Sequence, residues 1–253
     1  MPSQPSHAVS KRRLRVGQLL GRIHASHLAA LPGIKLQYVC DAVPAAASDL
    51  AQALGAQVFD IDTVLADPAI NAVAICSPTT THSDLIARAA AAGKYIFCEK
   101  PVDLSVPRAE AVAQTVASAG VGCMIGFQRR FDPTFNEVHR RMDAGEIGNP
   151  EMLLITSRAP GAPPVEYIKQ SGGIFRDMLI HDFDVFRWLL CANGDEAAWL
   201  SATGSVLIDP AVGAAGDFDC TAVSGHTTSM SGTLLGTATD RFSASLSNDS
   251  LTS

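Results

Sequence analysis

The sequence predicts an α/β protein in which a doubly wound parallel sheet precedes an α+β domain with an open, incomplete sheet. Two observations support this prediction. Apolar, strand-like runs alternate with Ala-rich, helix-like runs up to about residue 145, which is typical of a parallel sheet covered by helices on both faces. Beyond that point a strand-like run, a Pro-rich loop, a helix and another strand follow in a different order.

The predicted elements of the first part are short and regularly spaced. Each strand is a nearly continuous apolar run, as expected where both faces of a sheet are buried. Proline and asparagine in the sequence ADPAIN, residues 66–71, provide a turn before the third strand. The predicted strands are 15–20, 36–40, 71–75, 95–98 and 122–126, and the predicted helices are 22–31, 44–54, 81–92 and 106–119.

The second part has fewer elements and an unusual end. Of the 33 residues 221–253, 15 are Ser or Thr and almost none is charged, so we predict a disordered or weakly structured tail. We place the domains at residues 1–127, with 1–13 as a flexible tail, and 128–253. The elements predicted in the second domain are helix 133–144, strand 151–157, helix 174–190 and strand 198–207.

Composition excludes several classes of protein. The net charge of −6 argues against a general nucleic-acid binder, because neutralising phosphates requires clustered basic residues. The basic run Lys11–Arg13 is interpreted as a solvated leader. No apolar run approaches the length of a membrane span. The six cysteines form no C-x-x-C pair, which favours a reducing, cytoplasmic setting.

The first predicted strand and helix resemble the start of a dinucleotide-binding fold but lack its glycine motif. That motif, G-x-G-x-x-G, lets a pyrophosphate approach the backbone at a helix N-terminus. Here only Gly17 and Gly21 are near, and their spacing does not fit. Asp41 ends the second strand 20 residues after Gly21, where an acidic side chain binds the ribose hydroxyls and disfavours a 2′-phosphate. The alternative is an aspartate that caps the helix at Pro44.

Two further motifs carry candidate chemistry. Glu99-Lys100-Pro101 follows a buried strand, at the sheet edge where open α/β sheets bind ligands; an ordinary surface lysine is the alternative. Asp177 and His181 are four residues apart in a predicted helix, so the aspartate can orient the ring of a general base. The alternatives are a surface pair, or a metal site that adds Asp184 and would indicate a metal-dependent hydrolase.

Four stretches together resemble the glucose–fructose oxidoreductase and inositol dehydrogenase family over residues 14–220. They are GRIHASHLAALPG, AICSPTTTHSDLIARAAAAGKYIFCEKP, GFQRRFDPTF and EYIKQSGGIFRDMLIHDFDVFRWL. The resemblance implies a Rossmann domain that binds NAD, followed by a domain whose open sheet builds a homo-oligomer interface. It implies a catalytic group of Lys100, Asp177 and His181 converging on one cleft. It further places Ser77, Pro78 and His82 on the nicotinamide side and Glu99 as a cofactor-side acid.

The resemblance also implies a reaction. His181, oriented by Asp177, accepts the proton of a ring hydroxyl of a small polyol or sugar, while Lys100 polarises the developing carbonyl oxygen. The carbinol hydrogen leaves as hydride to NAD. For inositol, the expected reaction converts myo-inositol to 2-keto-inositol.

The chain departs from this family at the phosphate-binding turn. The simplest alignment removes four residues there and keeps Gly21 as the third glycine, with Arg22 and Ile23 as the cofactor-binding residues that follow. The Ser/Thr-rich residues 221–253 do not resemble the strands of the family's sheet. We therefore expect a poor or inactive dehydrogenase, and the alternative function is that of a catalytically silent relative acting as a binding or interaction protein.

Overall fold

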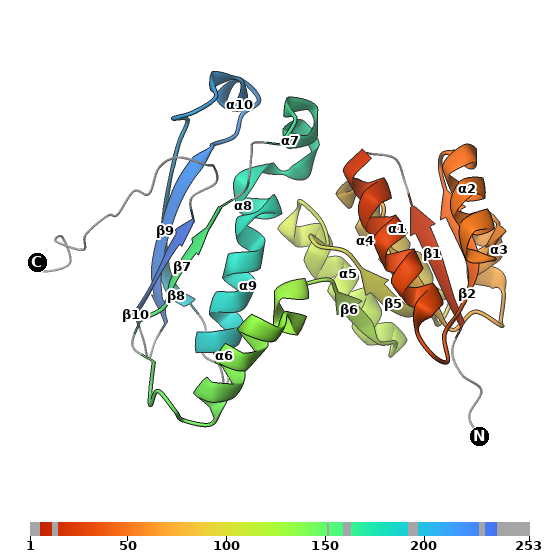
Figure 1. Ribbon diagram of the computed structural model, residues 1–253, viewed down its shortest axis with the longest axis horizontal. Coiled ribbons are helices and arrows are strands. Elements are labelled where there is room, and N and C mark those ends of the chain that lie inside the picture. The colour runs from red at the N-terminus through yellow and green to blue at the C-terminus, as the bar shows by residue number, and fades with distance from the viewer. Residues whose placement is uncertain are drawn as a thin grey trace, which may run out of the picture. The chain divides into compact units, whose positions relative to one another are not determined.

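The computed structural model describes residues 6–11, 15–150, 152–158, 163–191, 197–227 and 231–236. The chain divides into two compact units, residues 1–126 and 127–253, which are described separately (Figure 1). Within the described ranges, no helix is long and apolar enough to cross a membrane.

Unit 1 contains a six-stranded sheet with the order β3-β2-β1-β4-β5-β6, in which all neighbouring strands are parallel. This order reverses direction beside β1, as in doubly wound nucleotide-binding folds. The sheet agrees with the predicted fold class. Its strands are β1 (Ser6–Lys11), β2 (Lys35–Asp41), β3 (Gln57–Val58), β4 (Ala72–Ile75), β5 (Tyr95–Cys98) and β6 (Cys123–Ile125).

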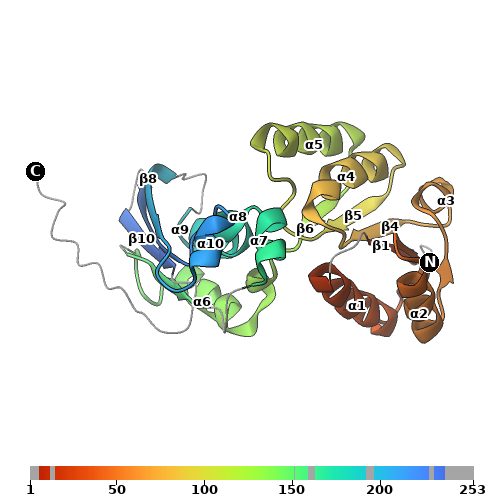
Figure 2. The ribbon, with the colours of Figure 1, turned by 90° about the horizontal axis from the view of Figure 1, so that it is seen from above.

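Helices cover both faces of this sheet. Helices α1 and α2 lie on one face and α4 and α5 on the other (Figure 2). Small buried alanines such as Ala47 and Ala51 let α2 pack closely against β2 and β4, whereas Ile86 of α4 packs on the opposite face. The helices of unit 1 are α1 (Arg15–Ala30), α2 (Pro44–Leu54), α3 (Ile61–Ala66), the 3-10 turn η1 (Thr79–Thr81), α4 (His82–Ala91) and α5 (Val106–Ala119).

Proline and glycine explain the limits of two of these helices. Both α2 and α5 have a proline in the first turn, where no backbone donor is lost, and each ends at a glycine in the left-handed region, Gly55 (φ 67°) and Gly120 (φ 65°). These signals lie in the sequence itself. The predicted helices 44–54 and 106–119 and the strand 95–98 are accordingly confirmed to the residue.

The prediction for the N-terminal region is wrong. Residues 15–20 belong to α1, and the first strand is Ser6–Lys11, inside the segment predicted to be a flexible tail. Val16, Leu19, Leu20 and Ile23 have the spacing i, i+3, i+4, i+7, which is the helical period rather than that of a strand. The connection between β1 and α1 is residues 12–14, outside the described residues.

Unit 2 combines a four-stranded mixed sheet with helices. Its order is β7-β10-β9-β8, with β7 and β10 parallel and the other pairs antiparallel. Along β7, Ile155 and Ser157 are buried while Leu154 and Thr156 are exposed. Buried Leu179, Val185 and Phe186 of α9 form a core with Ile155 and Val223.

The elements of unit 2 have the following bounds. They are η2 (Gln128–Phe131), α6 (Pro133–Asp143), β7 (Leu154–Ser157), α7 (Val165–Ser171), α8 (Gly173–Asp177), α9 (Leu179–Leu190), β8 (Ala197–Ser205), α10 (Pro210–Ala214), β9 (Cys220–Thr227) and β10 (Ser231–Gly236).

Two strands correct the prediction of a weakly structured tail. Residues Cys220–Thr227 and Ser231–Gly236 form β9 and β10, which pair with each other inside the sheet. Threonine and valine favour strands, and a segment with little charge lacks the high net charge that typically keeps a chain disordered. The remainder of the predicted tail, residues 228–230 and 237–253, lies outside the described residues.

Candidate functional site

A cavity of about 430 Å³ lies in unit 1 at the carboxyl ends of β2 and β4. This is the edge at which doubly wound sheets bind ligands. The structure brings two predicted site residues, Asp41 and Ser77, to the same cavity. The lining residues are Cys40, Asp41, Ala42, Phe59, Asp60, Ile61, Ser77, Thr80, Thr81, Asp84, Leu85 and Arg88.

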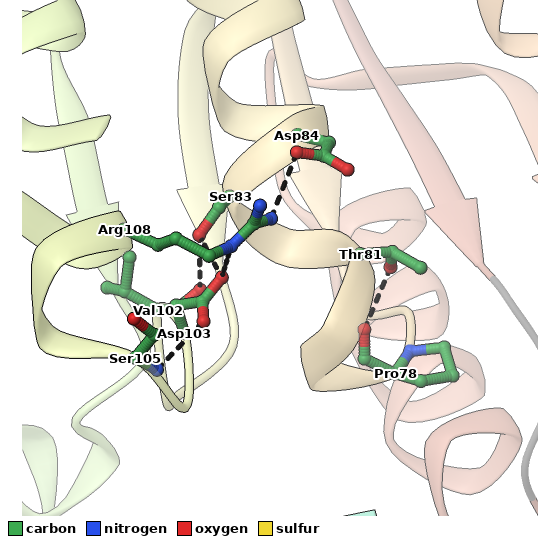
Figure 3. Close-up of polar contacts among 8 residues, drawn as sticks. All are labelled: Pro78, Thr81, Ser83, Asp84, Val102, Asp103, Ser105 and Arg108. Carbon is green, nitrogen blue, oxygen red and sulfur yellow. Dashed lines mark hydrogen bonds and ion pairs between the residues drawn. The ribbon is translucent and has the colours of Figure 1, made fainter. Parts of the chain in front are cut away.

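Asp41 lines this cavity as the last residue of β2. Its Oδ1 accepts the backbone N–H of Val43 at 2.9 Å, which fixes the carboxylate at the start of the following loop. After the end of β4, the Ser77 and Thr81 hydroxyls are 2.6 Å apart. Thr81 also donates to the carbonyl of Pro78 at 2.8 Å (Figure 3). The predicted residues Asp41, Ser77 and Pro78 thus lie on ordered strand ends.

Sequence reasoning missed Asp60, Asp84 and Arg88 of this cavity. Asp60 is the N-cap of α3 and accepts the Thr63 N–H at 2.8 Å. A capping pattern could have located its helix, but not its position beside the cavity, because that depends on how strands far apart in sequence align.

His82, predicted on the nicotinamide side, is buried within unit 1. Its ring is 1% exposed, with Nδ1 2.7 Å from the carbonyl oxygen of Pro101 and Nε2 2.7 Å from that of Ser77. The ring therefore connects the two strand-end loops that carry Ser77 and Lys100. A contribution of His82 to cofactor binding acts through these loops, since the ring is covered in unit 1.

Glu99 and Lys100 follow directly after β5. The Glu99 carboxylate lies 2.6 Å from His24 Nε2 of α1, and the His24 ring packs on Phe97 at 5.0 Å between centroids. A Cβ at Gly126 would lie 3.2 Å from Glu99 Oε2, so glycine leaves room for this carboxylate. The predicted cofactor-side acid is thus held against the helix that also carries Gly21, which is buried, and Arg22 and Ile23, which are exposed.

A cluster of three polar side chains fixes the loop after Lys100. Asp103 accepts hydrogen bonds from Ser83 Oγ at 2.6 Å and from Arg108 Nε at 2.9 Å (Figure 3); Asp103, Ser83 and Arg108 are called the Asp103 cluster below. The backbone N–H of Ser105 donates to the second carboxylate oxygen at 2.9 Å. Burial alone would raise the pKa of Asp103, but these bonds outweigh it and lower the pKa to about 2.

Unit 2 carries Asp177 and His181, but not within one continuous helix. The predicted helix 174–190 is interrupted at Met178, so that Asp177 ends α8 and His181 lies in the first turn of α9. Met178 remains in the right-handed helical region (φ −100°, ψ −57°), which keeps the two residues about one helical turn apart. Asp177 Oδ1 accepts a hydrogen bond from the Tyr167 hydroxyl at 2.9 Å.

A second cluster of the same residue types lies beside His181. Asp182, which is fully buried, accepts hydrogen bonds from Ser157 Oγ at 2.6 Å and from Arg129 Nη1; Asp182, Ser157 and Arg129 are called the Asp182 cluster below. The salt bridge joins η2 to the first turn of α9, and the Ser157 hydrogen bond adds β7. No periodic pattern in the sequence indicated this pairing, since its members are 25 and 53 residues apart.

The alternative of a metal site gains no support. Both oxygens of Asp184 accept hydrogen bonds from Arg130, at 2.8 and 2.6 Å. Across the part of the chain that the structure describes, no group of three His, Cys, Asp or Glu side chains could hold a metal ion.

Fold and site together define a class of protein: a Rossmann-type nucleotide-binding unit joined to a second α/β unit. The chain belongs to the GFO/IDH/MocA oxidoreductase family. Residues 16–127 match the family's NAD-binding Rossmann fold, and residues 135–247 match its C-terminal domain. The second match extends past residue 220, so the expectation that the resemblance ends there is wrong.

Individual relatives agree with this assignment. The chain is 52% identical to the inositol 2-dehydrogenase of Rhizobium meliloti over 204 residues, 81% of this chain and 61% of the relative. A Sinorhizobium meliloti structure described as a myo-inositol dehydrogenase has a TM-score of 0.87 at 45% identity, covering 93% of this chain and 70% of that chain. The scyllo-inositol dehydrogenase of Lactobacillus casei, crystallised with NAD(H) and scyllo-inositol, has a TM-score of 0.82 at 30% identity, with 94% and 70% covered.

The chain spans about three fifths of the length of the curated relatives it matches. NAD is the cofactor of this family's Rossmann fold. The residues of unit 1 fit its adenosine half, because the cavity has an acid at the end of β2 and small hydroxyl residues at the end of β4. The phosphate-binding turn differs: no glycine precedes Gly17, and residues 12–14 are Arg-Arg-Leu.

Proposed function

We propose that this chain carries the site of an NAD-dependent oxidoreductase that oxidises a ring hydroxyl of inositol, converting myo-inositol to 2-keto-inositol. The observation that carries the proposal is the cavity at the ends of β2 and β4, in which Asp41 and Ser77 meet. The relatives named above support the substrate class.

Under this proposal each predicted catalytic residue has one task. Bound NAD would accept the hydride. His181 takes the proton of the reacting hydroxyl, and Asp177 orients the imidazole for that transfer. Lys100 stabilises the negative charge that develops on the substrate oxygen. The buried contacts of His82 and the Asp103 cluster hold the loop that carries Lys100.

The proposal is tested by calorimetric titration with NAD and by inositol-dependent formation of NADH. Replacing Lys100→Met should reduce turnover by roughly a hundredfold or more, the scale for loss of one group that stabilises developing charge. Lys35→Met is the matched control, because Lys35 is exposed at the opposite end of β2. Turnover that needs an added metal ion, or equal effects of the two substitutions, would contradict the proposal.

The phosphate-binding turn favours the second candidate, a silent relative that binds a partner without turnover. Glycines at that turn allow backbone N–H groups to bind the pyrophosphate, and residues 12–14 contain none. If this reading is correct, the unsubstituted chain binds NAD weakly although Lys100, Asp177 and His181 are present.

Two variants separate the candidates. Replacing residues 12–14 with Gly-Ala-Gly should raise NAD affinity about a hundredfold, since one or two charge-assisted hydrogen bonds supply about 3 kcal/mol. The position between Leu19 and Leu20 lies inside α1. Inserting Gly-Ala-Gly-Arg there should lower the stability of the fold without raising the affinity for NAD. Full affinity and turnover in the original chain, unchanged by the replacement, would exclude a silent relative.

We further propose a homo-oligomer in a cytoplasmic setting. The sheet of unit 2 supports the first part, because Leu154 on its edge strand β7 is an exposed apolar side chain. The six cysteines of the sequence form no C-x-x-C pair, which supports a reducing compartment.

A further inference from the structure

The hydrogen bond between Tyr167 and Asp177 links two helices that meet at a sharp turn. Tyr167 lies on α7 and Asp177 ends α8, and the hydroxyl is 2.9 Å from Asp177 Oδ1. Both side chains are half-buried. A hydrogen bond to an ionised carboxylate is stronger than one between neutral groups, so this contact restrains the side chain that the proposed function assigns to His181.

Two glycines between α7 and α8 form the turn that brings these side chains together. Gly172 and Gly173 both have positive φ, 87° and 81°, a conformation that disfavours any other residue. The Asp217 carboxylate accepts the Ile174 N–H at 2.9 and 3.0 Å at the start of α8. A Cβ at Gly173 would lie 2.6 Å from Asp217 Oδ1, so the carboxylate leaves no room for a side chain at this position.

The chemistry of the pair fixes the direction of the hydrogen bond. An ionised aspartate only accepts, and a phenol donates through its single hydrogen. Burial, followed by the negative charge of Asp177 and the hydrogen bond itself, raises the pKa of Tyr167 well above its usual range. The phenol therefore remains a donor across the pH range in which a dehydrogenase works.

We propose that Tyr167 is a positioning residue: its hydroxyl holds the Asp177 carboxylate in the orientation that Asp177 needs to orient His181. This inference rests on the proposed function and extends it by a residue that does not itself take part in the hydride or proton transfer.

The test compares two tyrosines that each donate to an aspartate. Tyr38 of β2 donates to Asp67 Oδ2 at 2.8 Å in unit 1, and neither residue is assigned a role in the reaction. Tyr167→Phe should lower kcat for inositol oxidation about tenfold or more, as expected for loss of a hydrogen bond to a charged group, with the KM for NAD unchanged. Tyr38→Phe should lower thermal stability and leave kcat unchanged.

A double-variant cycle tests whether Tyr167 acts through Asp177. In an Asp177→Asn background the additional change Tyr167→Phe should alter kcat less than twofold, because the carboxylate that the hydroxyl holds is gone. Equal losses of kcat in Tyr167→Phe and Tyr38→Phe, or full additivity in the cycle, would overturn the positioning role of Tyr167. Neither result would contradict the proposed function.

A measurement without turnover keeps this inference distinguishable from the proposed function. The chain has three tyrosines, so a difference absorbance titration between the unsubstituted chain and Tyr167→Phe isolates Tyr167. Asp177→Asn should lower the midpoint of that transition, and an unchanged midpoint would refute the contact. If the unsubstituted chain shows no turnover while the midpoint moves, the proposed function fails and the catalytic role of Tyr167 fails with it, whereas the pairing with Asp177 stands.

Discussion

The Asp103 cluster of unit 1 and the Asp182 cluster of unit 2 use the same three residue types but differ in their exposure to water. The Arg108 side chain is 51% exposed, whereas Arg129 is 21% exposed and its partner Asp182 is fully buried. Water can take the place of an exposed partner, but a buried charge that loses its partner stays uncompensated. Burial, and not the identity of the residues, therefore decides how much each pair matters.

The difference also concerns how each catalytic candidate is held. The loop after Lys100 is fixed by several modest bonds, including the Ser105 N–H to Asp103 and the His82 ring to Pro101. The start of α9, which carries His181, is held by the buried pair of Arg129 with Asp182, by Ser157 and by the more exposed pair of Arg130 with Asp184. Removal of a single contact should be tolerated in the first region and damaging in the second.

The largest expected effect is that of Arg129→Met. This change removes the charge and keeps an apolar stem, so that Asp182 remains buried without its cation. The free energy of unfolding should fall by about 3–5 kcal/mol, the scale for breaking a buried pair from one side. Urea unfolding of the full chain, followed by circular dichroism, measures this value.

Arg108→Met is the matched control for that prediction. Its partner Asp103 keeps the Ser83 and Ser105 bonds, and the exposed arginine should contribute about 0–1 kcal/mol. Losses of equal size in the two variants would break the comparison, since they would show that burial does not separate the clusters.

The next largest effect concerns acid stability in the Asp103 cluster. The pKa of Asp103 is lowered to about 2 in the folded chain, below its unfolded value of about 4. A lowered pKa stabilises the fold above the unfolded value, and this contribution is lost as pH falls from about 4 to about 2. Asp103→Asn should remove a contribution on the order of 2 kcal/mol at neutral pH and flatten the acid limb of the stability curve. An acid limb of unchanged slope would show that the cluster does not hold the carboxylate in its ionised form.

Local signals account for the parts of the fold that the sequence predicted well. Pro44 with Gly55 and Pro107 with Gly120 mark the ends of α2 and α5 within a few residues of each helix. Between residues 15 and 23 the apolar spacing fits a helix, and the short run SHAVSK of β1 has little apolar content of its own. Its place between β2 and β4 comes from pairing with strands distant in sequence.

The candidate site shows the same limit. Spacing from Gly21 led to Asp41, and the family resemblance led to Ser77. The two residues share a cavity because each lies at the carboxyl end of a strand. The partners that hold the candidates in place could not be found this way. Arg129 and Asp182 are 53 residues apart, and His82 and Pro101 are 19 apart, so their contacts exist only after the units have folded.

A smaller effect is expected from the two serines. Ser157→Ala removes a hydrogen bond to the buried Asp182 carboxylate and should lower the free energy of unfolding by about 1.5 kcal/mol. Ser83→Ala, in the less buried cluster, should lower it by roughly half of that, because water can replace the hydroxyl. Thermal unfolding of the two variants measures this difference between the clusters. A larger loss of stability in Ser83→Ala than in Ser157→Ala would contradict the effect of burial.

The smallest effect concerns Asp41, a third carboxylate that contrasts with both clusters. Its Oδ1 accepts the Val43 N–H, and the side chain lines the cavity, so its charge acts on a ligand bound there. A carboxylate at this position favours the ribose hydroxyls of NAD and repels the 2′-phosphate of NADP. Asp41→Asn keeps an oxygen for Val43 and removes the charge, and it should raise the ratio of NADP to NAD affinity about fivefold, equivalent to about 1 kcal/mol.

Asp49→Asn makes the same change of charge on the exposed face of α2, outside the cavity lining. Calorimetric titration of both variants with each cofactor separates the local effect of Asp41 from that of net charge. The ratio should be unchanged in Asp49→Asn, because screening by salt weakens an interaction between distant exposed charges. Tighter binding of NADP than of NAD by the unsubstituted chain would contradict the role of Asp41, and with it the distinction between carboxylates that hold a loop and one that selects a ligand.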